Sequence, residues 1–473
     1  MLWHRSRRIW CPGVTALLVN YHVCDKIFNY QVRQYLLRMN VMPDLEARVG
    51  DPLSVALIGP GVYGSHLAYQ IEETPGVEPT VLADLELEKA TETFRTAGVP
   101  DDAVTVEDTA DGAAEALAAG RRVATTDGVV AAGAPVDVVI ETTGDAHAAA
   151  VHAWEAIDAG NDVVMVSVEV DATIGPLLAR FAEQRGVTYS MAYGDEPAQV
   201  VELCDWARTQ GLEVVAAGQG TELTFKPHAT HEDSLQRYDL PESFIENSKP
   251  DARMYNTFLD GTKVAVELCA AANALGFPPD TDGIHMPETD RDGLLETLRP
   301  VEDGGVLDRT GVIDSVTPTG DNPSAFVVTE ATNDATQAYL SQRYNINTSN
   351  DGKYQVFHRP YHLPQETMVS VAMAGLHDRP TGTVTEQTTE VVAAAKRDLE
   401  PGETIVGGGG DTIYGRLQDA DVAAEADLVP FELLAGAELE RPVSTDQPIS
   451  TADVSLRTDT PLYHLRELQN SLL

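Results

Sequence analysis

Cysteines, basic residues and long apolar runs are all scarce in this chain of 473 residues. Its four cysteines, at positions 11, 24, 204 and 269, form no CxxC pair and no other metal-binding spacing. We therefore expect a protein of the reducing cytoplasm rather than a disulfide scaffold. No segment approaches about 18 consecutive apolar residues, so the sequence predicts no transmembrane helix.

Basic residues are far fewer than acidic residues. The chain has 32 Lys and Arg residues against 74 Asp and Glu residues, a net charge of −42. This charge repels nucleic acids and anionic lipid surfaces, which excludes partners bound through a broad basic face. The acidic residues are spread evenly, as in a halophilic protein, because in molar salt the Debye length falls to about 3 Å and self-repulsion is screened. An apolar fraction of 43% excludes disorder, and the length predicts roughly two to four domains.

The first 41 residues differ in composition from the rest. They carry six basic residues against one acid, Asp25, and they contain two of the four cysteines. An Arg-rich, acid-poor start is typical of a targeting peptide. A start codon assigned too early, with Met39 or Met42 as the true first residue, is the explanation we favour, because the apolar run 14–19 is short for a signal peptide. We leave residues 1–41 out of the functional argument.

A glycine-rich turn lies where a dinucleotide-binding fold requires it. Residues 54–59 are predicted to form a buried strand. Residues 59–64 (GPGVYG) would form the turn, and the segment up to Pro75 would form a helix. A second strand at 81–83 ends in Asp84. In this context the glycines allow a pyrophosphate to approach the helix N-terminus, and the acid binds a ribose hydroxyl. The alternative is a glycine turn that only packs a helix on a sheet. Asp84 favours NAD, while NADP stays open because molar salt softens the repulsion of a 2′-phosphate.

Strands and helices go on alternating, which predicts a doubly wound parallel sheet. Further strands are expected at 136–140, 163–168 and 187–191, and a helix from about Pro176. Ligand-contacting residues follow the carboxyl ends of such strands, where Glu169 and Asp195 lie. Each has a plainer alternative, a solvated loop acid for Glu169 and a helix cap for Asp195. The predicted cofactor-binding residues are Gly59, Gly61, Val62, Tyr63, Gly64, Asp84, Thr143 and Gly144.

The middle of the chain reads as a substrate domain. Lys263 lies at the start of a predicted helix that ends near Gly276. From this position the Lys263 side chain can polarise a carbonyl or relay an alcohol proton, with Asp260 as its orienting partner. The plainer alternative is a solvent pair between Lys263 and Glu267, four residues apart. The predicted catalytic residues are Lys263, Asp260, Glu169, His362 and Arg359, with Arg359 and His362 as the substrate anchor. The predicted substrate-binding residues are Asp195, Gln219, Thr221 and His358.

No metal site is indicated. HEXXH is absent, and Pro360 argues against a helix carrying both His358 and His362. A divalent metal stays open as an alternative. The two histidines can also be packing residues of a surface loop.

Seven sequence blocks together carry a resemblance. They are GPGVYG, VVIETTGDAHA, MVSVEVDATIGP, SMAYGDEPA, FLDGTK, HRPYHL and KRDLEPGETI, which span about residues 54–455. Their order resembles the homoserine dehydrogenase-like NAD(P)-dependent oxidoreductases that carry a C-terminal SAF domain. It is also similar to the related type II 1-deoxy-D-xylulose 5-phosphate reductoisomerase-like proteins.

The resemblance implies an α/β protein with three domains. We expect a Rossmann dinucleotide-binding domain at 51–195 with a doubly wound parallel sheet. A central α/β catalytic domain at 196–378 would bind substrate and form the dimer, and a small all-β SAF-like (β-clip) domain would follow at 388–460. The turn Pro401-Gly402 separates two predicted strands of this last domain within 390–405.

The chain departs from the family pattern at two places. Glu267 stands where homoserine dehydrogenases carry an essential Lys, with Lys263 one turn earlier. The turn at 218–222 reads GQGTE, without the two lysines of the reductoisomerase-like branch, which favours an unphosphorylated substrate.

The expected function is that of an NAD(P)-dependent dehydrogenase or reductase. It would act on the CH–OH group of a small hydroxylated metabolite such as a hydroxy acid or sugar acid, as a homodimer or homotetramer. One alternative is an NADPH-dependent reductoisomerase of a sugar or sugar phosphate. A second is a non-catalytic dinucleotide-binding sensor.

Overall fold

The structure is a computed structural model of the whole chain. It describes residues 41–473 apart from 233, 239–241, 243–244, 246–249, 291–292, 319–323, 344–345 and 361–362. The chain divides into two compact units, residues 1–43 and 44–473. Almost all of the predicted extension 1–41 lies outside the described residues, so the fold below is that of the second unit. A short helix, α2 (Met42–Glu46), comes first in the described part.

The first sheet has seven parallel strands within the described residues, in the order β3-β4-β2-β1-β5-β6-β7. The strands are β1 (Leu53–Ile58), β2 (Val77–Ala83), β3 (Val104–Val106), β4 (Arg122–Thr125), β5 (Val138–Glu141), β6 (Asp162–Met165) and β7 (Tyr189–Met191). The predicted Rossmann-type α/β fold is confirmed. The outer strands β3 and β4 escaped the sequence analysis because three and four residues are too few to show a period.

Helices cover both faces of this sheet, because alternate residues of each strand point to opposite sides. Ala56 and Val139 face a core shared with α5, α6 and α7, whereas Gly375 of α16 approaches Leu53 and Val138 on the other side. The helices of this part are α3 (Val62–Glu73), α4 (Leu87–Thr96), η1 (Asp101–Ala103), α5 (Ala110–Ala118), α6 (Gly128–Ala132), α7 (Ala146–Ala159), α8 (Val168–Arg185) and α16 (Thr367–His377). In the described part of the chain, no helix has both the length and the apolar character that a membrane span requires.

The strand order creates a crevice at one place. β1 pairs with β2 on one side and β5 on the other, and the chain leaves β1 toward β2 before it returns to β5. A ligand of an open α/β sheet binds at such a reversal, beyond the carboxyl ends of the strands. Here those ends lead into Gly59 and into Thr142.

The helix expected from about Pro176 begins earlier. α8 starts at Val168 and is kinked at Ile174, whose φ and ψ are −137° and 15°. The kink has a local cause, because a proline disfavours helical geometry in the residues before it and donates no hydrogen bond. The first turn of α8, which carries Glu169 and Asp171, therefore has its own direction.

The second sheet is mixed and has five strands among the described residues, in the order β11-β12-β10-β8-β9. α9 and α13 pack against it and against each other, and a second core forms around Leu294, Leu298 and Phe326. Its strands are β8 (Leu212–Gly220), β9 (Val312–Val316), β10 (Ser324–Ala331), β11 (Asn347–Thr348) and β12 (Tyr354–Pro360). The helices are α9 (Glu196–Thr209), α10 (Ser234–Arg237), α12 (Ala252–Asp260), α13 (Thr262–Leu275), α14 (Leu294–Thr297), η2 (Val301–Asp303), α15 (Asp334–Leu340) and η3 (Pro364–Glu366).

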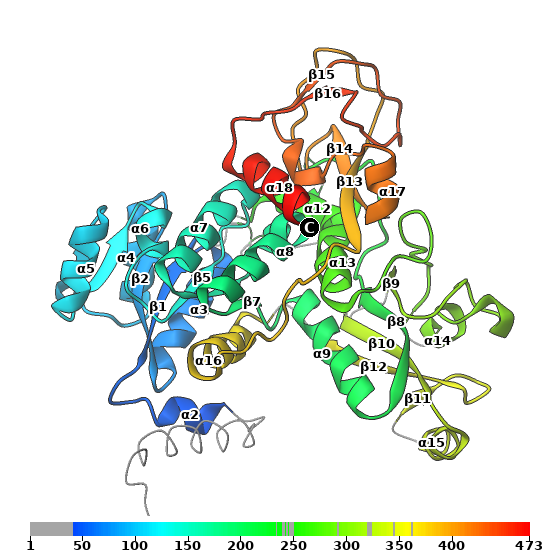
Figure 1. Cartoon of the computed structure of the whole chain (residues 1–473), viewed down its shortest axis with the longest axis horizontal. Coiled ribbons are helices and arrows are strands. Elements are labelled where there is room, and N and C mark those ends of the chain that lie inside the picture. Colours follow the sequence, from blue (N-terminus) through cyan, green and yellow to red (C-terminus); the bar gives the residue numbers. More distant parts are fainter. Residues whose placement is uncertain are drawn as a thin grey trace, which may run out of the picture. The chain divides into compact units, whose positions relative to one another are not determined.

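The C-terminal module (residues 388–460) is built from small antiparallel sheets, as predicted. β13 (Thr389–Ala395) pairs with β14 (Ile413–Asp419), and β15 (Glu438–Leu439) pairs with β16 (Val454–Ser455). The turn at 401–402 is present, but the second strand expected within 390–405 is reduced to single bridges at Leu399 and Thr404. The module also contains α17 (Ala420–Glu425) and η4 (Phe431–Leu433), and it is followed by α18 (Pro461–Leu472), which packs on α8 (Figure 1).

Candidate active site

The glycine turn is shaped by contacts with the end of β5. Gly59 has φ +88°, and a Cβ placed on Gly64 would lie 2.6 Å from both the Gly59 carbonyl oxygen and Thr142 Oγ1. A Cβ on Gly61, in contrast, would meet only the Gly59 oxygen, at 4.0 Å. Packing within the protein therefore requires glycine at 59 and 64, while the space beside Gly61 is open. Gly61 is also the N-cap of α3 and makes no side-chain cap, so this helix N-terminus fits an anionic group.

The remaining predicted cofactor residues border the same crevice. Val62 is 52% exposed at the start of α3, whereas the Tyr63 hydroxyl lies 2.8 Å from Thr367 Oγ1 at the start of α16. Asp84 follows β2 and accepts a hydrogen bond from the backbone N–H of Glu86 at 2.8 Å. Lys89 Nζ is 4.0 Å from Asp84 and 2.7 Å from Glu86.

A buried carboxylate organises the turn after β5. Glu141 is fully buried and accepts hydrogen bonds from Thr143 Oγ1 at 2.6 Å and from Ser167 Oγ. Ser167 Oγ in turn accepts the backbone N–H of Gly144 at 2.8 Å. This network ties the turn after β5 to the start of α8, where Glu169 lies two residues beyond Ser167.

Lys263 lies at the centre of the site. Its Nζ is 2.8 Å from Glu169 Oε1 and 4.0 Å from Glu267 Oε1, and its side chain is only 12% exposed. Burial alone lowers the pKa of Lys263, but Glu169, Glu267 and Asp195 together raise it well above its ordinary range. The three carboxylates therefore favour the charged ammonium form of Lys263, which is buried and not paired in solvent.

Three carboxylates gather beside Lys263. Asp195, Glu196 and Glu267 are all buried and each offers an oxygen within 4.8 Å of the others. Burial raises the pKa of Glu196 well above its ordinary value, and Asp195 adds to this effect. Gln219 Nε2 donates to Glu267 Oε2 at 2.8 Å. The sequence analysis indicated no metal, yet this oxygen set fits a hard divalent cation such as Mg²⁺ or Mn²⁺.

The sequence analysis identified only part of this carboxylate cluster. Asp195 was considered either as a helix cap or as a site residue, and its side chain makes no cap for α9. Glu196 follows it directly in the GDEP block but was not singled out. The sequence analysis names Glu267 as a possible solvent partner of Lys263 and as a departure from a family pattern, but not as a site residue.

Asp260 has a different partner from the one expected. Its Oδ2 lies 2.6 Å from Lys396 Nζ of the C-terminal module, and both residues are buried. Its Oδ1 accepts the backbone N–H of Thr262 at 2.9 Å, which stabilises the turn at Gly261 between α12 and α13. Asp260 thus holds the backbone that carries Lys263, while Glu169 holds the Lys263 side chain.

The remaining predicted substrate residues in the described part of the chain contact other side chains of the protein. Arg359 lies 3.5 Å from Glu202, 3.3 Å from Glu366 and over the Tyr193 ring, with its Cζ 5.0 Å from the ring centre. Thr221 Oγ1 donates to Thr317 Oγ1 at 2.9 Å. His358, on β12, lies 3.2 Å from Ser324 Oγ on β10, and His362 lies outside the described residues.

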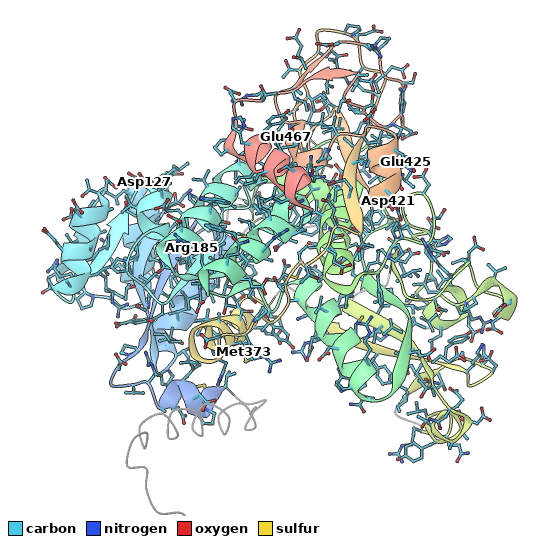
Figure 2. All side chains as sticks on the ribbon, viewed as in Figure 1. Asp127, Arg185, Met373, Asp421, Glu425 and Glu467 are labelled. Atoms are coloured by element: carbon cyan, nitrogen blue, oxygen red, sulfur yellow. The ribbon has the colours of Figure 1, made fainter. Side chains whose placement is uncertain are left out.

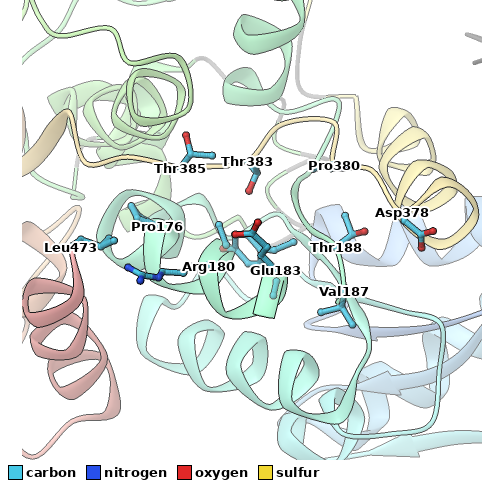
Figure 3. A pocket seen from close by; sticks show the side chains of 13 residues that line it. Pro176, Arg180, Glu183, Val187, Thr188, Asp378, Pro380, Thr383, Thr385 and Leu473 are labelled. Carbon is cyan, nitrogen blue, oxygen red and sulfur yellow. The ribbon is translucent and has the colours of Figure 1, made fainter. Parts of the chain in front are cut away.

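An open pocket lies beside another part of α8. It has a volume of about 500 Å³ and is lined by the C-terminal half of α8, residues 187–189, residues from the segment 378–385 and Leu473 (Figure 3). None of the described residues that line it belongs to the candidate site.

Comparison with known families supports an enzyme. Residues 194–366 match the model of the family described as oxidoreductase DRL, catalytic domain. The chain is an oxidoreductase. The matched segment contains Asp195, Glu196, Lys263 and Glu267, so the oxidoreductase catalytic domain and the carboxylate cluster coincide. No curated protein matches the chain.

Several solved structures share parts of the architecture. A probable dehydrogenase from Thermotoga maritima is 12% identical, with a TM-score of 0.36 over 68% of this chain and 87% of that one. The 1-deoxy-D-xylulose 5-phosphate reductoisomerase of Zymomonas mobilis, in complex with NADPH, is 14% identical, with a TM-score of 0.39 over 68% and 71%. A myo-inositol dehydrogenase from Corynebacterium glutamicum is 11% identical, with a TM-score of 0.36 over 69% and 89%.

Proposed function

We propose that this oxidoreductase uses a nicotinamide dinucleotide to oxidise or reduce a CH–OH group of a small hydroxylated metabolite. The observation that carries the proposal is the position of Lys263. Its partner Glu169 starts the helix that Ser167 ties to Gly144, at the edge of the crevice beyond β1 and β5. A buried cation beside a dinucleotide crevice is what hydride exchange with a carbonyl requires, because negative charge develops on the oxygen.

The crevice fits the cofactor on its own residues. The open space at Gly61 and the uncapped start of α3 suit a pyrophosphate, and Asp84 suits a ribose hydroxyl. Asp84 favours NAD. NADP remains the alternative, because Lys89 is near enough to offset part of the charge of Asp84. When bound, the nicotinamide supplies the two-electron acceptor or donor.

The chain's own residues have separate roles in this proposal. Lys263 polarises the substrate oxygen and stays charged throughout, since three carboxylates hold its proton. Glu169 keeps the ammonium in position. Asp195, Gln219 and Glu267 are placed to accept or donate hydrogen bonds to neighbouring hydroxyls of the substrate.

The carboxylates around Lys263 favour an uncharged polyol, and a hydroxy acid or sugar acid would need Arg359 as its anchor. Arg359 is already paired with two carboxylates. A phosphorylated substrate is disfavoured for the same reason. We retain the homoserine dehydrogenase-like and SAF-like assignments, a homodimer or homotetramer and a cytoplasmic location as parts of the proposal.

The cofactor is tested first, by the thermal stability of the full chain in molar KCl with NAD⁺ or NADP⁺. A ligand at 100 times its dissociation constant adds about 2.7 kcal/mol of stability. Stabilisation by one cofactor supports the proposal, and turnover is then screened by NAD(P)H absorbance with polyols, hydroxy acids and sugar acids. Failure of both cofactors to stabilise the protein would overturn it.

A metal-dependent reductoisomerase is the second candidate, favoured by the Asp195–Glu196–Glu267 cluster. The test is turnover of a sugar or sugar phosphate with NADPH, with and without Mn²⁺, in the wild type and in Glu267→Gln. Activity that requires Mn²⁺ and is lost in the variant supports the reductoisomerase. Turnover that is indifferent to chelation supports simple dehydrogenation.

A further inference from the structure

The hydrogen-bond ladder of α8 is interrupted between its first turn and its second half. Pro176 has no backbone N–H, so the Ala172 carbonyl oxygen, four residues earlier, has no helical donor. Ile174, between them, has non-helical dihedral angles. The first turn carries Glu169, so the geometry of this interruption decides where the Glu169 carboxylate lies.

The side-chain amide of Gln469, on α18, bridges the interruption. Gln469 Oε1 accepts the backbone N–H of Leu177 at 3.0 Å, and Gln469 Nε2 donates to the Thr173 carbonyl oxygen at 3.3 Å. In a regular α-helix these two backbone groups bond each other, because each N–H donates to the carbonyl four residues earlier. Gln469 is only 1% exposed, so its amide is a partner for both groups where water has little access.

Neighbouring side chains fix both the amide and the carbonyl that it contacts. Gln469 Nε2 also donates to Gln387 Oε1 at 3.0 Å. Arg466, about one turn earlier on α18, donates from Nη1 to the Thr173 carbonyl oxygen at 3.0 Å. Arg466 is itself paired with the buried Glu390 of β13. The C-terminal module therefore holds α18 in the position at which Gln469 meets the interruption.

Printed contacts join the interruption to the Lys263–Glu169 pair. Thr173 Oγ1 donates to the Glu169 carbonyl oxygen at 2.7 Å, and Glu169 Oε1 lies 2.8 Å from Lys263 Nζ. Cys269, on the same helix as Lys263, has its Sγ 3.8 Å from the Ala172 carbonyl oxygen. The first turn of α8 is thus held by α13 at Glu169 and Ala172, and by α18 at Thr173.

We propose that Gln469 is a positioning residue of the site, through which α18 sets the direction of the first turn of α8. Without the amide, the Leu177 N–H regains a protein partner by moving toward the Thr173 carbonyl, because an unpaired buried N–H is costly. That movement closes the interruption and turns Glu169 away from the place where it holds the Lys263 ammonium. Gln469 acts only through α8 and is not a catalytic residue. This inference rests on the proposed dehydrogenase function.

The experiment compares the wild type with Gln469→Met, Gln469→Glu and the control Glu467→Gln. Met keeps the length of the side chain and removes both the donor and the acceptor. Glu keeps an acceptor for the Leu177 N–H and removes the donor to the Thr173 carbonyl. Glu467 lies on the same helix and is exposed (Figure 2).

The first readout is turnover of myo-inositol, an uncharged polyol, with NAD⁺ or NADP⁺ in molar KCl. We expect Gln469→Met to lower kcat by about 10–10²-fold, because a small displacement of a positioning group costs this much. KM and the cofactor dissociation constant should change little. Gln469→Glu should recover part of the loss in kcat, and Glu467→Gln should behave as wild type.

A second comparison separates positioning from stability. In the Glu169→Gln background the carboxylate that Gln469 positions is already gone, so adding Gln469→Met should lower kcat little further. A residue that only stabilises the fold would lower kcat by the same factor in both backgrounds.

A third readout needs no turnover. Residues that do not interact shift the urea midpoint additively. We expect Gln469→Met combined with Glu169→Gln to shift the midpoint by less than the sum of the two single shifts, and Glu467→Gln combined with Glu169→Gln to shift it by the full sum. If Gln469→Met does not fold, Gln469→Glu takes its place in both comparisons.

The outcomes separate the two proposals. Wild-type kcat in the Gln469 variants, equal losses of kcat in the two backgrounds, or additive midpoint shifts overturn the role of Gln469. If the wild type neither binds NAD(P)⁺ nor oxidises any alcohol, the dehydrogenase function fails, and the midpoint shifts still decide whether Gln469 is coupled to Glu169. If another alcohol is the substrate, the same variants are compared with that alcohol.

Discussion

The buried Lys396–Asp260 pair is the most direct test of how the C-terminal module is joined to the site. Lys396 is 5% exposed, and its Nζ donates to Asp260 Oδ2 at 2.6 Å and to the carbonyl oxygens of Ala229 and Gly410, both at 2.7 Å. One ammonium thus connects α12, the segment before α10 and the glycine loop that follows β13. Lys396→Met keeps the apolar stem and removes the charge.

The expected loss of stability comes from the buried Asp260 charge that remains when Lys396 is replaced. Breaking a buried pair by removing one partner costs about 3–5 kcal/mol, because the other charge stays buried. Burial raises the pKa of Asp260 and lowers the pKa of Lys396, so in both residues the attraction offsets only part of the cost of burial. We therefore expect Lys396→Met to lower the free energy of unfolding by about 3–5 kcal/mol, and the double variant with Asp260→Asn to lose much less than the sum of the two single changes.

The assay is urea unfolding in molar KCl, followed by intrinsic fluorescence. The neighbouring residue supplies the control, because Arg397 is paired with Glu403 at 2.8 Å but is 44% exposed. Arg397→Met should change the free energy of unfolding by at most about 1 kcal/mol. The reasoning is refuted if Lys396→Met is as mild as Arg397→Met, or if the double variant loses the full sum.

Three further predictions concern the site itself. Lys263→Met should lower kcat by about 10²–10³-fold and leave the cofactor dissociation constant unchanged in a binding titration; loss of both would indicate a purely structural lysine. Gly64→Ala should weaken cofactor binding at least about tenfold, because its Cβ would meet atoms 2.6 Å away, and calorimetry that finds wild-type affinity would contradict the cradle. Burial raises the pKa of Asp171 from 3.8 to about 7. Stability should therefore fall by up to about 4 kcal/mol on this account as the pH rises through that range, and Asp171→Asn should remove this part of the pH dependence; an unchanged difference between urea midpoints at pH 5 and pH 8 would refute this.

The crevice could be predicted from sequence because its determinants are local. The turn at 59–64 follows a buried strand directly, and Asp84 directly follows the next strand. The kink in α8 was also readable in principle, since Pro176 lies inside the helix, but its effect on Glu169 was not. The periodicity of apolar residues shows which face of a helix or strand is apolar, but it does not show which distant residues contact that face.

The carboxylate cluster illustrates the limit. Asp195 and Glu196 are adjacent in sequence, but Glu267 joins them from another helix, and acidic residues are too common in this chain to point to a site.

The sequence by itself determined the alternation of strands and helices, the glycine turn, the acid after the second strand and the antiparallel strands of the C-terminal module. Each of these is set by neighbouring residues through backbone preference and the period of apolar side chains. Only the tertiary structure decided which charges meet. Lys263 pairs with Glu169, 94 residues away, and Asp260 with Lys396, 136 residues away. Such pairs depend on how layers of elements pack, because burial makes an unpaired charge costly wherever in the chain its partner lies.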